Sequence, residues 1–221
     1  AHESLGARIV DFGGWDMPVQ YEGIVAESKA TRERVGIFDI GHMGRVEFVG
    51  PDAVAAVDWC VSCHVAALAE GRVKYGLLLT EEGKALDDVL VYRDSDRVHV
   101  VVNAGNRDRD RETFRERVRE KGFDCVVIDA ACPNEPNQER SFLGKPQSML
   151  ALQGPRSEDL LQRIVNSSTD LSKLRYYRML RSSVIGLPCL ISRTGYTGED
   201  GFEVFVEATE IWRVWDVLLC Q

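Results

Sequence analysis

The stretch Arg193-Thr194-Gly195-Tyr196-Thr197-Gly198-Glu199-Asp200-Gly201-Phe202-Glu203 carries a glycine at every third position. Apolar, strand-like residues lie on both sides of it, over 188–192 and 202–206. Glycine permits backbone angles and close approaches that a side chain forbids, and an ordinary hairpin needs only one glycine. The pattern therefore predicts a tight, shaped connection between two strands.

Two interpretations of this connection stay open. In the first it is a surface turn decorated with acidic residues. In the second it is one wall of a ligand pocket, where Tyr196 stacks on a ring and Glu203 makes a directed hydrogen bond. The pattern alone favours neither.

Composition excludes several classes of protein. The 221 residues are 44% hydrophobic and 28% charged, which is enough to bury a core in one large or two smaller units. The net charge of -8 argues against nucleic acid as a main partner, because phosphate binding needs a basic surface. No apolar run approaches the length of a membrane span, and no basic-then-apolar leader is visible. We expect neither a nucleic acid nor a membrane as partner.

The cysteines include a motif that needs an explanation. Cys60-Val61-Ser62-Cys63-His64 matches the attachment pattern of c-type haem. The same segment is typical of the end of a helix that begins at Pro51. Two thiols at this spacing could also be redox-active or form half a zinc site, but the sequence has no second Cys-x-x-Cys or His pair to complete one. We interpret the motif as a coincidence in a reducing cytosol and expect no haem and no metal.

Periodicity and turn residues predict an α+β fold. A turn over Glu81–Lys84 joins two strands as a hairpin, and helices on one side of a mostly antiparallel sheet form an α+β module. The segment 132–147 is expected to be a linker or surface loop. Expected helices cover 24–35, a segment from residue 51, 106–121, 155–165 and 207–220, and expected strands cover 45–49, 75–80, 86–92, 98–102, 123–128, 148–152, 176–184, 188–192 and 202–206.

Asp87 and Asp88 interrupt one of these strands. Successive strand residues point to opposite faces, so one aspartate faces the interior or a pocket while the other faces solvent. An unpaired buried charge costs several kcal/mol, which gives the inward carboxylate a need for a partner or a function. The alternative is that both aspartates close the neighbouring turn in water.

Several motifs follow one another in a fixed order along the chain. Together with the stretch around Gly195 they resemble the glycine-cleavage T-protein, the tetrahydrofolate-dependent aminomethyltransferase, and its folate-binding relatives. The resemblance covers nearly the whole chain. The motifs are DFGGWDMP over 11–18, GIFDIGHM over 36–43, the segment 83–92, VVNAGNR over 101–107 and LQGP over 152–155.

The resemblance implies a T-protein-like folate-binding fold with antiparallel sheets and flanking helices. Its first domain is discontinuous and is expected over 1–49 and 148–221, with an α+β domain inserted over 50–131. In the family a C-terminal β-barrel domain follows, and we expect it to be missing here. The family's arginine-bearing segment is also expected beyond Gln221, and Gly41 stands where the family usually has serine.

The reaction that the resemblance implies involves a lipoyl-bearing partner, the H-protein. Its arm carries an aminomethyl group, tetrahydrofolate takes the one-carbon unit, and ammonia leaves. The location would be cytoplasmic in a bacterium and the mitochondrial matrix in a eukaryote. Such chemistry needs proximity and charge placement from the protein. A carboxylate can orient the folate and stabilise an iminium-like carbon, and the resemblance gives that catalytic role to Asp88.

The remaining site residues carry over from the resemblance as folate contacts. Met43 would supply a soft apolar contact, and aromatic rings would stack over the pterin or benzoate rings. Core packing is the alternative for each apolar residue taken singly. The expected folate-binding set is Met43, Tyr75, Asp88, Leu90, Val101, Asn103, Tyr196 and Glu203.

Two other functions are kept as alternatives. One is a folate-dependent demethylase acting on a small substrate. The other is a folate-binding module of the same family without transfer activity. The segment Gly13–Pro18 favours the T-protein over the first, and the presence of Asp88 argues against the second.

Overall fold

The structure is a computed structural model that describes residues 2–221. It divides into two compact units, and the chain passes between them more than once. Unit 1 comprises the chain up to His42, Ser148–Tyr176 and Arg181–Gln221, and unit 2 comprises Met43–Gln147 and Tyr177–Leu180. Each unit is built around its own five-stranded sheet.

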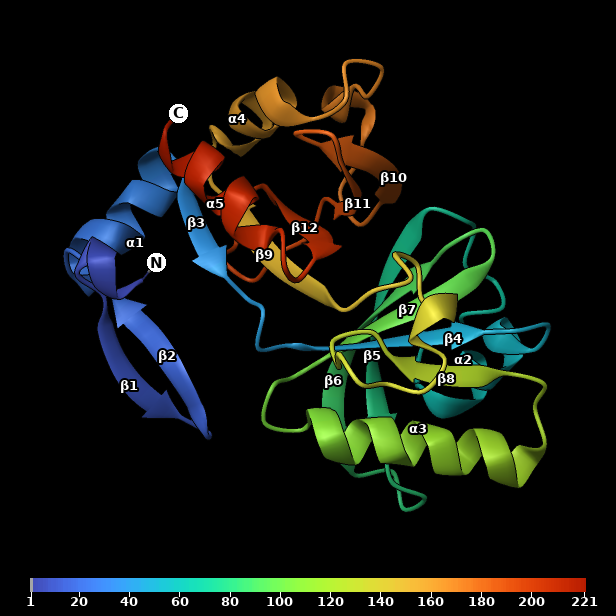
Figure 1. Cartoon of the computed structure of the whole chain (residues 1–221). Coiled ribbons are helices and arrows are strands. Elements are labelled where there is room, and N and C mark those ends of the chain that lie inside the picture. The colour runs from blue at the N-terminus through green and yellow to red at the C-terminus, as the bar shows by residue number, and fades with distance from the viewer. Residues whose placement is uncertain (1) are drawn as a thin grey trace. The chain divides into compact units, whose positions relative to one another are not determined.

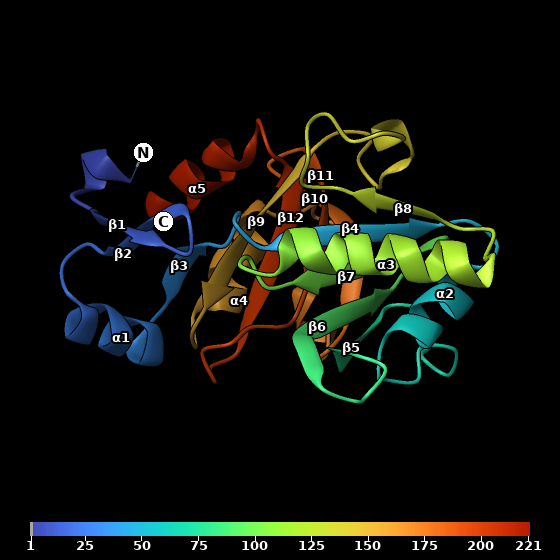
Figure 2. The same ribbon diagram turned by 90° about the horizontal axis from the view of Figure 1, so that it is seen from below.

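Unit 2 is a sheet with two helices along one face (Figures 1 and 2). The strand order is β5-β6-β7-β4-β8, and every neighbouring pair is antiparallel. The strands are β4 (Gly44–Val49), β5 (Arg72–Leu79), β6 (Ala85–Arg93), β7 (Arg97–Val102) and β8 (Val126–Asp129), and the helices are α2 (Ala53–Cys60), α3 (Arg107–Lys121) and the 3-10 turn η2 (Gln138–Arg140).

The core of unit 2 lies between this sheet and its helices. Phe48 from β4 and Phe114 from α3 are fully buried and meet edge to face, with ring centroids 5.3 Å apart. Burying each such ring contributes about 1.5–3 kcal/mol. Because side chains alternate along a strand, the residues between the core valines point to the sheet's other face.

Helix α3 forms despite its dense charge. Asp110, Phe114 and Val118, spaced at i, i+4 and i+8, are its buried residues. The exposed residues make ion pairs at i,i+3, such as Asp108 with Arg111, and pairs of this kind stabilise helices modestly. The helix is thus a solvated surface with a narrow apolar stripe.

Unit 1 contains the second sheet, in the order β10-β11-β12-β9-β3, and a separate two-stranded hairpin, β1-β2. β11 pairs with β12 and β3 pairs with β9, both antiparallel. Its elements are η1 (Glu3–Leu5), β1 (Arg8–Phe12), β2 (Trp15–Gln20), α1 (Ile24–Glu33), β3 (Gly36–Asp39), β9 (Gln147–Gln153), α4 (Ser157–Ile164), η3 (Leu171–Lys173), β10 (Met179–Val184), β11 (Leu187–Ser192), β12 (Gly201–Glu207) and α5 (Ile211–Leu219).

The three spaced glycines connect β11 to β12, and the buried amide of Gln153 explains two of them. A Cβ on Gly195 would collide with that amide, and a Cβ on Gly201 would lie 2.6 Å from the Gln153 Cδ. The amide nitrogen donates to the main-chain oxygen of Thr194 at 3.0 Å. Gly198 has φ +79°, a left-handed conformation that favours glycine. The loop is therefore wrapped around one side chain.

Some segments pair differently from the sequence expectation. β4, expected in the first domain, is a central strand of unit 2 because it bonds to both β7 and β8. Residues 132–147 also belong to unit 2, where the main-chain amide of Gln147 donates to the main-chain oxygen of Ala130 at 2.7 Å. The Met179 amide donates to the Gly71 oxygen at 2.9 Å, which joins residues 177–180 to the same unit.

Three strands of unit 1, β1, β2 and β3, were not expected from the sequence. The hairpin β1-β2 turns at Gly13 and Gly14, which both have positive φ, as a tight hairpin turn requires. β3 also had no counterpart in the expected strands. No helix within residues 2–221 is both long and apolar enough to cross a bilayer.

Candidate functional site

Three of the expected folate residues form one row across the sheet of unit 2. Tyr75 on β5 pairs with Leu90 on β6, which pairs with Val101 on β7. Leu90 and Val101 alternate with core valines, so the row lies on the face that does not carry α2 and α3. Tyr75 is 47% exposed, whereas the other two are buried. The row is apolar and buried over two residues, with an aromatic ring at its exposed end.

The two consecutive aspartates of β6 point to opposite faces. Asp87 is buried and reaches α3, whereas Asp88 is half-buried and shares the face of Leu90. Asn103, which directly follows β7, joins them: its Nδ2 donates to Asp87 Oδ1 at 3.0 Å and to Asp88 Oδ1 at 2.9 Å. Asp88 is thus held by an amide at the edge of the apolar row.

Asp87 is the centre of a hydrogen-bond cluster. Its carboxylate accepts the main-chain amide of Asn103 at 2.9 Å and the side-chain amide of Asn106 at 2.7 Å. Burial by itself would raise the pKa of Asp87, but hydrogen bonds from Asp110, Asn103 and Asn106 outweigh it and lower that pKa. Asp87 is therefore an anion whose charge is fixed by its neighbours.

Asp110 lies beside Asp87 on the first turn of α3 and is fully buried. Burial first, and then the hydrogen bond and charge of Asp87, raise the pKa of Asp110 to about 7. Arg109 opposes this shift by donating to Asp110 Oδ1 from Nε at 3.0 Å and Nη2 at 2.9 Å. We call Asp87, Asp88, Asn103, Asn106 and Asp110 the open cluster.

The half-buried residues of the open cluster on β6 and after β7, Asp88 and Asn103, each keep one acceptor without a hydrogen bond among residues 2–221. Both Nδ2 hydrogens of Asn103 are used on the aspartates, so its Oδ1 is the atom left for a ligand. Asp88 Oδ2 is the second such atom. Two acceptors at the edge of an apolar row suit the donor-bearing edge of a flat heteroaromatic ring such as a pterin. These two acceptors therefore fit the folate that the sequence predicts.

A second polar cluster lies on the same sheet face, and both carboxylate oxygens of its Glu47 accept hydrogen bonds. Glu47 Oε2 accepts from Arg97 at 2.9 Å and from the Phe142 amide at 2.8 Å, while Oε1 accepts from Gln147 at 2.6 Å. His99 lies between Glu47 and Asp94, with nitrogen–oxygen distances of 3.4 and 3.2 Å. The closed cluster, defined as Glu47, Asp94, Arg97, His99 and Gln147, pins the 132–147 segment onto the sheet.

The remaining expected residues divide between the units. Met43 is half-buried in unit 2, and its carbonyl oxygen accepts Arg45 Nη1 at 2.7 Å. Tyr196 and Glu203 belong to unit 1. Tyr196 is 62% exposed, whereas Glu203 is buried and accepts the hydroxyl of Thr194. The structure groups six of the expected residues in unit 2 and describes the other two within unit 1.

Sequence reasoning did not single out Asn106 or Asp110, and it assigned Asp87 no role. A signal for them exists in the pattern. Asn106 and Asp110 stand at i and i+4, so they share one face at the start of a predicted helix. An acidic residue on the buried stripe of such a helix requires a polar partner. The Asp87-Asp88 pair, of which one member must face inward, could have been considered as that partner.

The Cys-x-x-Cys-His segment lies at the end of α2. Cys60 and Cys63 are both buried, and burial raises the pKa of the Cys60 thiol to about 12 and also raises that of Cys63. Because the thiolate is the nucleophile and metal ligand, both thiols are unreactive near neutral pH. His64 pairs with Asp58 at 3.0 Å. Across residues 2–221, no three His, Cys, Asp or Glu side chains gather closely enough to hold a metal.

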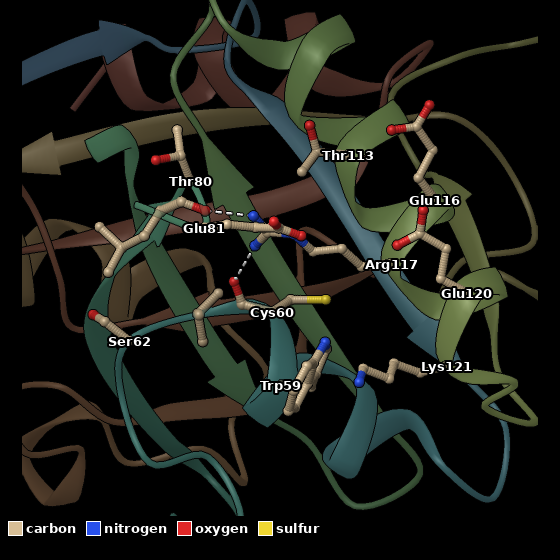
Figure 3. Close-up of a pocket in the computed structure, with 12 residues that line it drawn as sticks. Trp59, Cys60, Ser62, Thr80, Glu81, Thr113, Glu116, Arg117, Glu120 and Lys121 are labelled. Atoms are coloured by element: carbon tan, nitrogen blue, oxygen red, sulfur yellow. Dashed lines mark hydrogen bonds between the residues drawn. The ribbon is translucent and has the colours of Figure 1, made fainter. Parts of the chain in front are cut away.

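A hollow of unit 2 lies between the ends of α2 and β5 and helix α3 (Figure 3). Arg117 donates to the carbonyl oxygens of Cys60, at 2.9 Å, and of Leu79. Lys121 lies 3.9 Å from the centroid of the Trp59 ring. These contacts tie α3 to its neighbours, and none of the expected folate residues lines the hollow. The candidate site is therefore the open cluster with its apolar row.

The whole chain matches one protein family. The sequence profile described as the GCVT N-terminal domain matches residues 1–221. The chain belongs to this family. The resemblance to the glycine-cleavage T-protein is thereby confirmed at the level of the family.

Curated relatives of this GCVT N-terminal domain are named aminomethyltransferases. One from Rubrobacter xylanophilus is 45% identical over 215 residues, which are 96% of this chain and 53% of that protein. One from Herpetosiphon aurantiacus is 42% identical over 219 residues, which are 99% of this chain and 56% of that protein. The chain spans about half the length of the curated relatives it matches.

Solved structures confirm the predicted fold class. Glycine cleavage system aminomethyltransferase T from Bartonella henselae superposes with a TM-score of 0.84 at 31% identity, covering 99% of this chain and 55% of that one. A chain of heterotetrameric sarcosine oxidase from Corynebacterium sp. U-96 shares the fold, with a TM-score of 0.58 at 15% identity over 88% of each chain. The GCVT N-terminal domain is thus an α+β fold with antiparallel sheets and flanking helices.

Proposed function

We propose that the chain is the folate-binding part of an aminomethyltransferase of the glycine cleavage system. The reaction transfers the methylene unit from the S-aminomethyl-dihydrolipoyl arm of H-protein to tetrahydrofolate and releases ammonia. Family membership and the names of the relatives support the reaction class. The observation that carries the proposal is the Asp88 carboxylate, held by Asn103 at the edge of the Tyr75–Leu90–Val101 row.

The row and the open cluster have separate tasks in this proposal. Leu90 and Val101 give a dry floor against which a ring can lie, and the Tyr75 ring packs on it from the exposed end. The two free acceptors, on Asp88 and Asn103, accept hydrogen bonds from the ring's edge and fix its orientation. Binding by shape and orientation by hydrogen bonds is the usual division in small-molecule sites.

Asp88 contributes a placed negative charge. Tetrahydrofolate supplies the nucleophilic nitrogen that takes the one-carbon unit. A carboxylate near the reacting carbon stabilises positive charge that develops there, and it acts without reorganisation because Asn103 already holds it. Removing one such preorganised group typically costs about 10²–10³ in rate. Asp88 is therefore the catalytic residue of the proposed site.

Three further residues remain proposed folate contacts, each within its own unit. Met43 gives a polarisable apolar contact. Tyr196 and Glu203 give an aromatic ring and a carboxylate from the shaped loop and β12 of unit 1. H-protein, through its lipoyl arm, is the proposed partner.

A transfer assay tests the proposal. The chain is mixed with aminomethyl-loaded H-protein and tetrahydrofolate, and methylene-tetrahydrofolate and ammonia are measured. We expect Asp88→Asn to lower turnover by about 10²-fold or more, with folate affinity within about tenfold because the charge acts mainly in the transition state. Asp124→Asn, an aspartate beyond α3, is the control and keeps wild-type turnover. Wild-type turnover in Asp88→Asn contradicts the role, and no product from the wild-type chain contradicts the function.

A further inference from the structure

We propose that Asp87 is a positioning residue, which orients Asp88 through Asn103 and is itself locked by a proton that it shares with Asp110. The inference rests on the proposed function of Asp88. It assigns roles to Asp87, Asn106 and Asp110, which touch no substrate in the proposed site.

The first observation is the chain of contacts. Asp87 Oδ2 accepts the Asn103 main-chain amide at 2.9 Å, and Asp87 Oδ1 accepts Asn103 Nδ2 at 3.0 Å. The same nitrogen also donates to Asp88 Oδ1 at 2.9 Å. Asn103 thus donates to Asp87 from both its main chain and its side chain, so its side-chain amide can hold Asp88 in only one direction.

The second observation is an isolated oxygen. Asp110 is fully buried, and its Oδ2 accepts no hydrogen bond from residues 2–221. An ionised, buried carboxylate oxygen without a donor carries a large desolvation cost. A proton on Asp110 removes this cost and lets its carboxyl donate to Asp87, its hydrogen-bond partner, and two adjacent buried carboxyls cannot both ionise easily. The raised pKa of Asp110 and the lowered pKa of Asp87 agree with that assignment.

The positive charges near Asp87 and Asp110 do not replace the proton that these two carboxyls share. From α3 itself, Arg109 donates to Asp110 Oδ1 and not to Asp110 Oδ2. Its Nη2 also donates to the Leu86 oxygen at 2.7 Å. From β6 the facing charge is Asp87, and the β7–α3 connection presents the neutral amides of Asn103 and Asn106. The other basic residues on this turn are paired elsewhere, Arg107 and Arg111 with Asp129.

The consequence is a pH-dependent orientation of Asp88. Below about pH 7 Asp110 is protonated and donates to Asp87. When the pH rises further, two buried negative charges repel each other, and Asp87 moves or turns away from Asn103. Asn103 then holds Asp88 less firmly, and transfer slows although Asp88 itself stays charged.

The pH dependence of the Asn103 side-chain amide resonance tests the positioning without any substrate. In the wild-type chain we expect it to shift with a midpoint near pH 7, the value for Asp110. In Asp110→Asn it should stay constant, because the new amide donates to Asp87 and does not titrate. Asp108→Asn, an exposed neighbour on the same turn, is the control and keeps the wild-type midpoint.

A constant Asn103 resonance in the wild-type chain overturns the inference, and so does an unchanged midpoint in Asp110→Asn. Asp87→Asn gives a second test, because Asp110 then loses its charged neighbour and its midpoint should fall well below 7. A wild-type midpoint in Asp87→Asn also overturns the shared proton.

The transfer assay then links positioning to catalysis. Asp87→Asn should lower kcat by about 10²-fold, since small misplacements of a catalytic group cost that much, with KM for tetrahydrofolate nearly unchanged. Asp110→Asn should keep its activity at high pH, where the wild type declines. A decline identical to wild type overturns the inference. No transfer by the wild-type chain overturns the proposed function instead, while the amide titration still decides the positioning.

Discussion

The closed and open clusters of unit 2 use the same kinds of side chain on neighbouring strands. In the closed cluster both oxygens of Glu47 are saturated by Arg97, Gln147 and the Phe142 amide. In the open cluster Asp87 is saturated in the same way, but Asp88 Oδ2 and Asn103 Oδ1 have no partner among residues 2–221. A saturated cluster can only hold the fold together, whereas unused acceptors beside an apolar row can hold a ligand.

The pKa values show the same contrast. Burial would raise the pKa of Glu47, but His99, Arg97 and Gln147 lower it to about 2. Burial would lower the pKa of His99, yet Glu47 and Asp94 raise it. The closed cluster thus balances its charges. The open cluster contains one carboxyl, Asp110, with a pKa of about 7, so it is poised to lose a proton.

Removing Glu47 should have the largest effect on stability. In Glu47→Ala, Arg97 and His99 lose the buried carboxylate that they share and keep only Asp96 and Asp94 as acidic partners, and breaking such a buried pair typically costs about 3–5 kcal/mol. Urea unfolding measures the loss. Asp96→Ala removes the exposed partner of the same Arg97 and should cost less than about 1 kcal/mol. Equal losses in the two variants would contradict the assignment of Glu47 as the centre of the closed cluster.

Removing a side-chain amide donor should destabilise the protein more in the closed cluster than in the open one. Gln147→Leu leaves Glu47 Oε1 without its 2.6 Å donor in a buried site and should cost about 1–3 kcal/mol. Asn106→Leu removes the 2.7 Å donor to Asp87, but Asn106 is half-buried and water can replace it, so the loss should be less than half as large. Unfolding free energies in urea give both values, and the reverse order would refute the contrast.

Glu47 and Asp110 should contribute to the pH dependence of stability with opposite signs. The lowered pKa of Glu47 gives stability that is present above pH 4.5 and is lost as the pH falls toward 2. The raised pKa of Asp110 gives stability that is lost as the pH rises from 3.8 toward 7. Asp110→Asn should therefore remove a decline of at most about 1.4 kcal/mol per pH unit between these values. Unfolding curves measured at several pH values check this, and parallel wild-type and variant profiles would refute it.

Removing Asp88 should have the smallest effect on stability. Asp88 is half-buried and one of its oxygens is unused, so Asp88→Ala should change the unfolding free energy by less than about 1 kcal/mol. Thermal and urea unfolding measure this change. A loss comparable with that of Glu47→Ala would make Asp88 a structural residue and remove the reason to place function there.

The sequence predicted most elements, because their signals are local. Apolar alternation on either side of the Glu81–Lys84 turn predicted the β5-β6 hairpin, and Gly122 after a charged run predicted the end of α3. The hairpin β1-β2 was missed although Gly13-Gly14 marks its turn, since its strands carry few buried residues.

The candidate site was predicted less completely, because its contacts depend on strand register. The alternation of Asp87 and Asp88 could be read from the chain, and the structure places them on opposite faces. Their bonds to Asn103 join residues 15 and 16 positions apart, and Gln147 meets Glu47 across 100 positions. Likewise the glycines at 195 and 201 suggested close packing, but only the fold identifies the Gln153 amide as the group they accommodate.

We propose that tetrahydrofolate binds at the open cluster and not at the closed one. Titrating the isotope-labelled chain with tetrahydrofolate under reducing conditions, and following its NMR resonances, tests this directly. We predict saturable shifts at Tyr75, Leu90 and Asn103, and unchanged resonances at His99 and Gln147. Shifts confined to the closed cluster, or no shifts at all, would contradict binding at the open cluster.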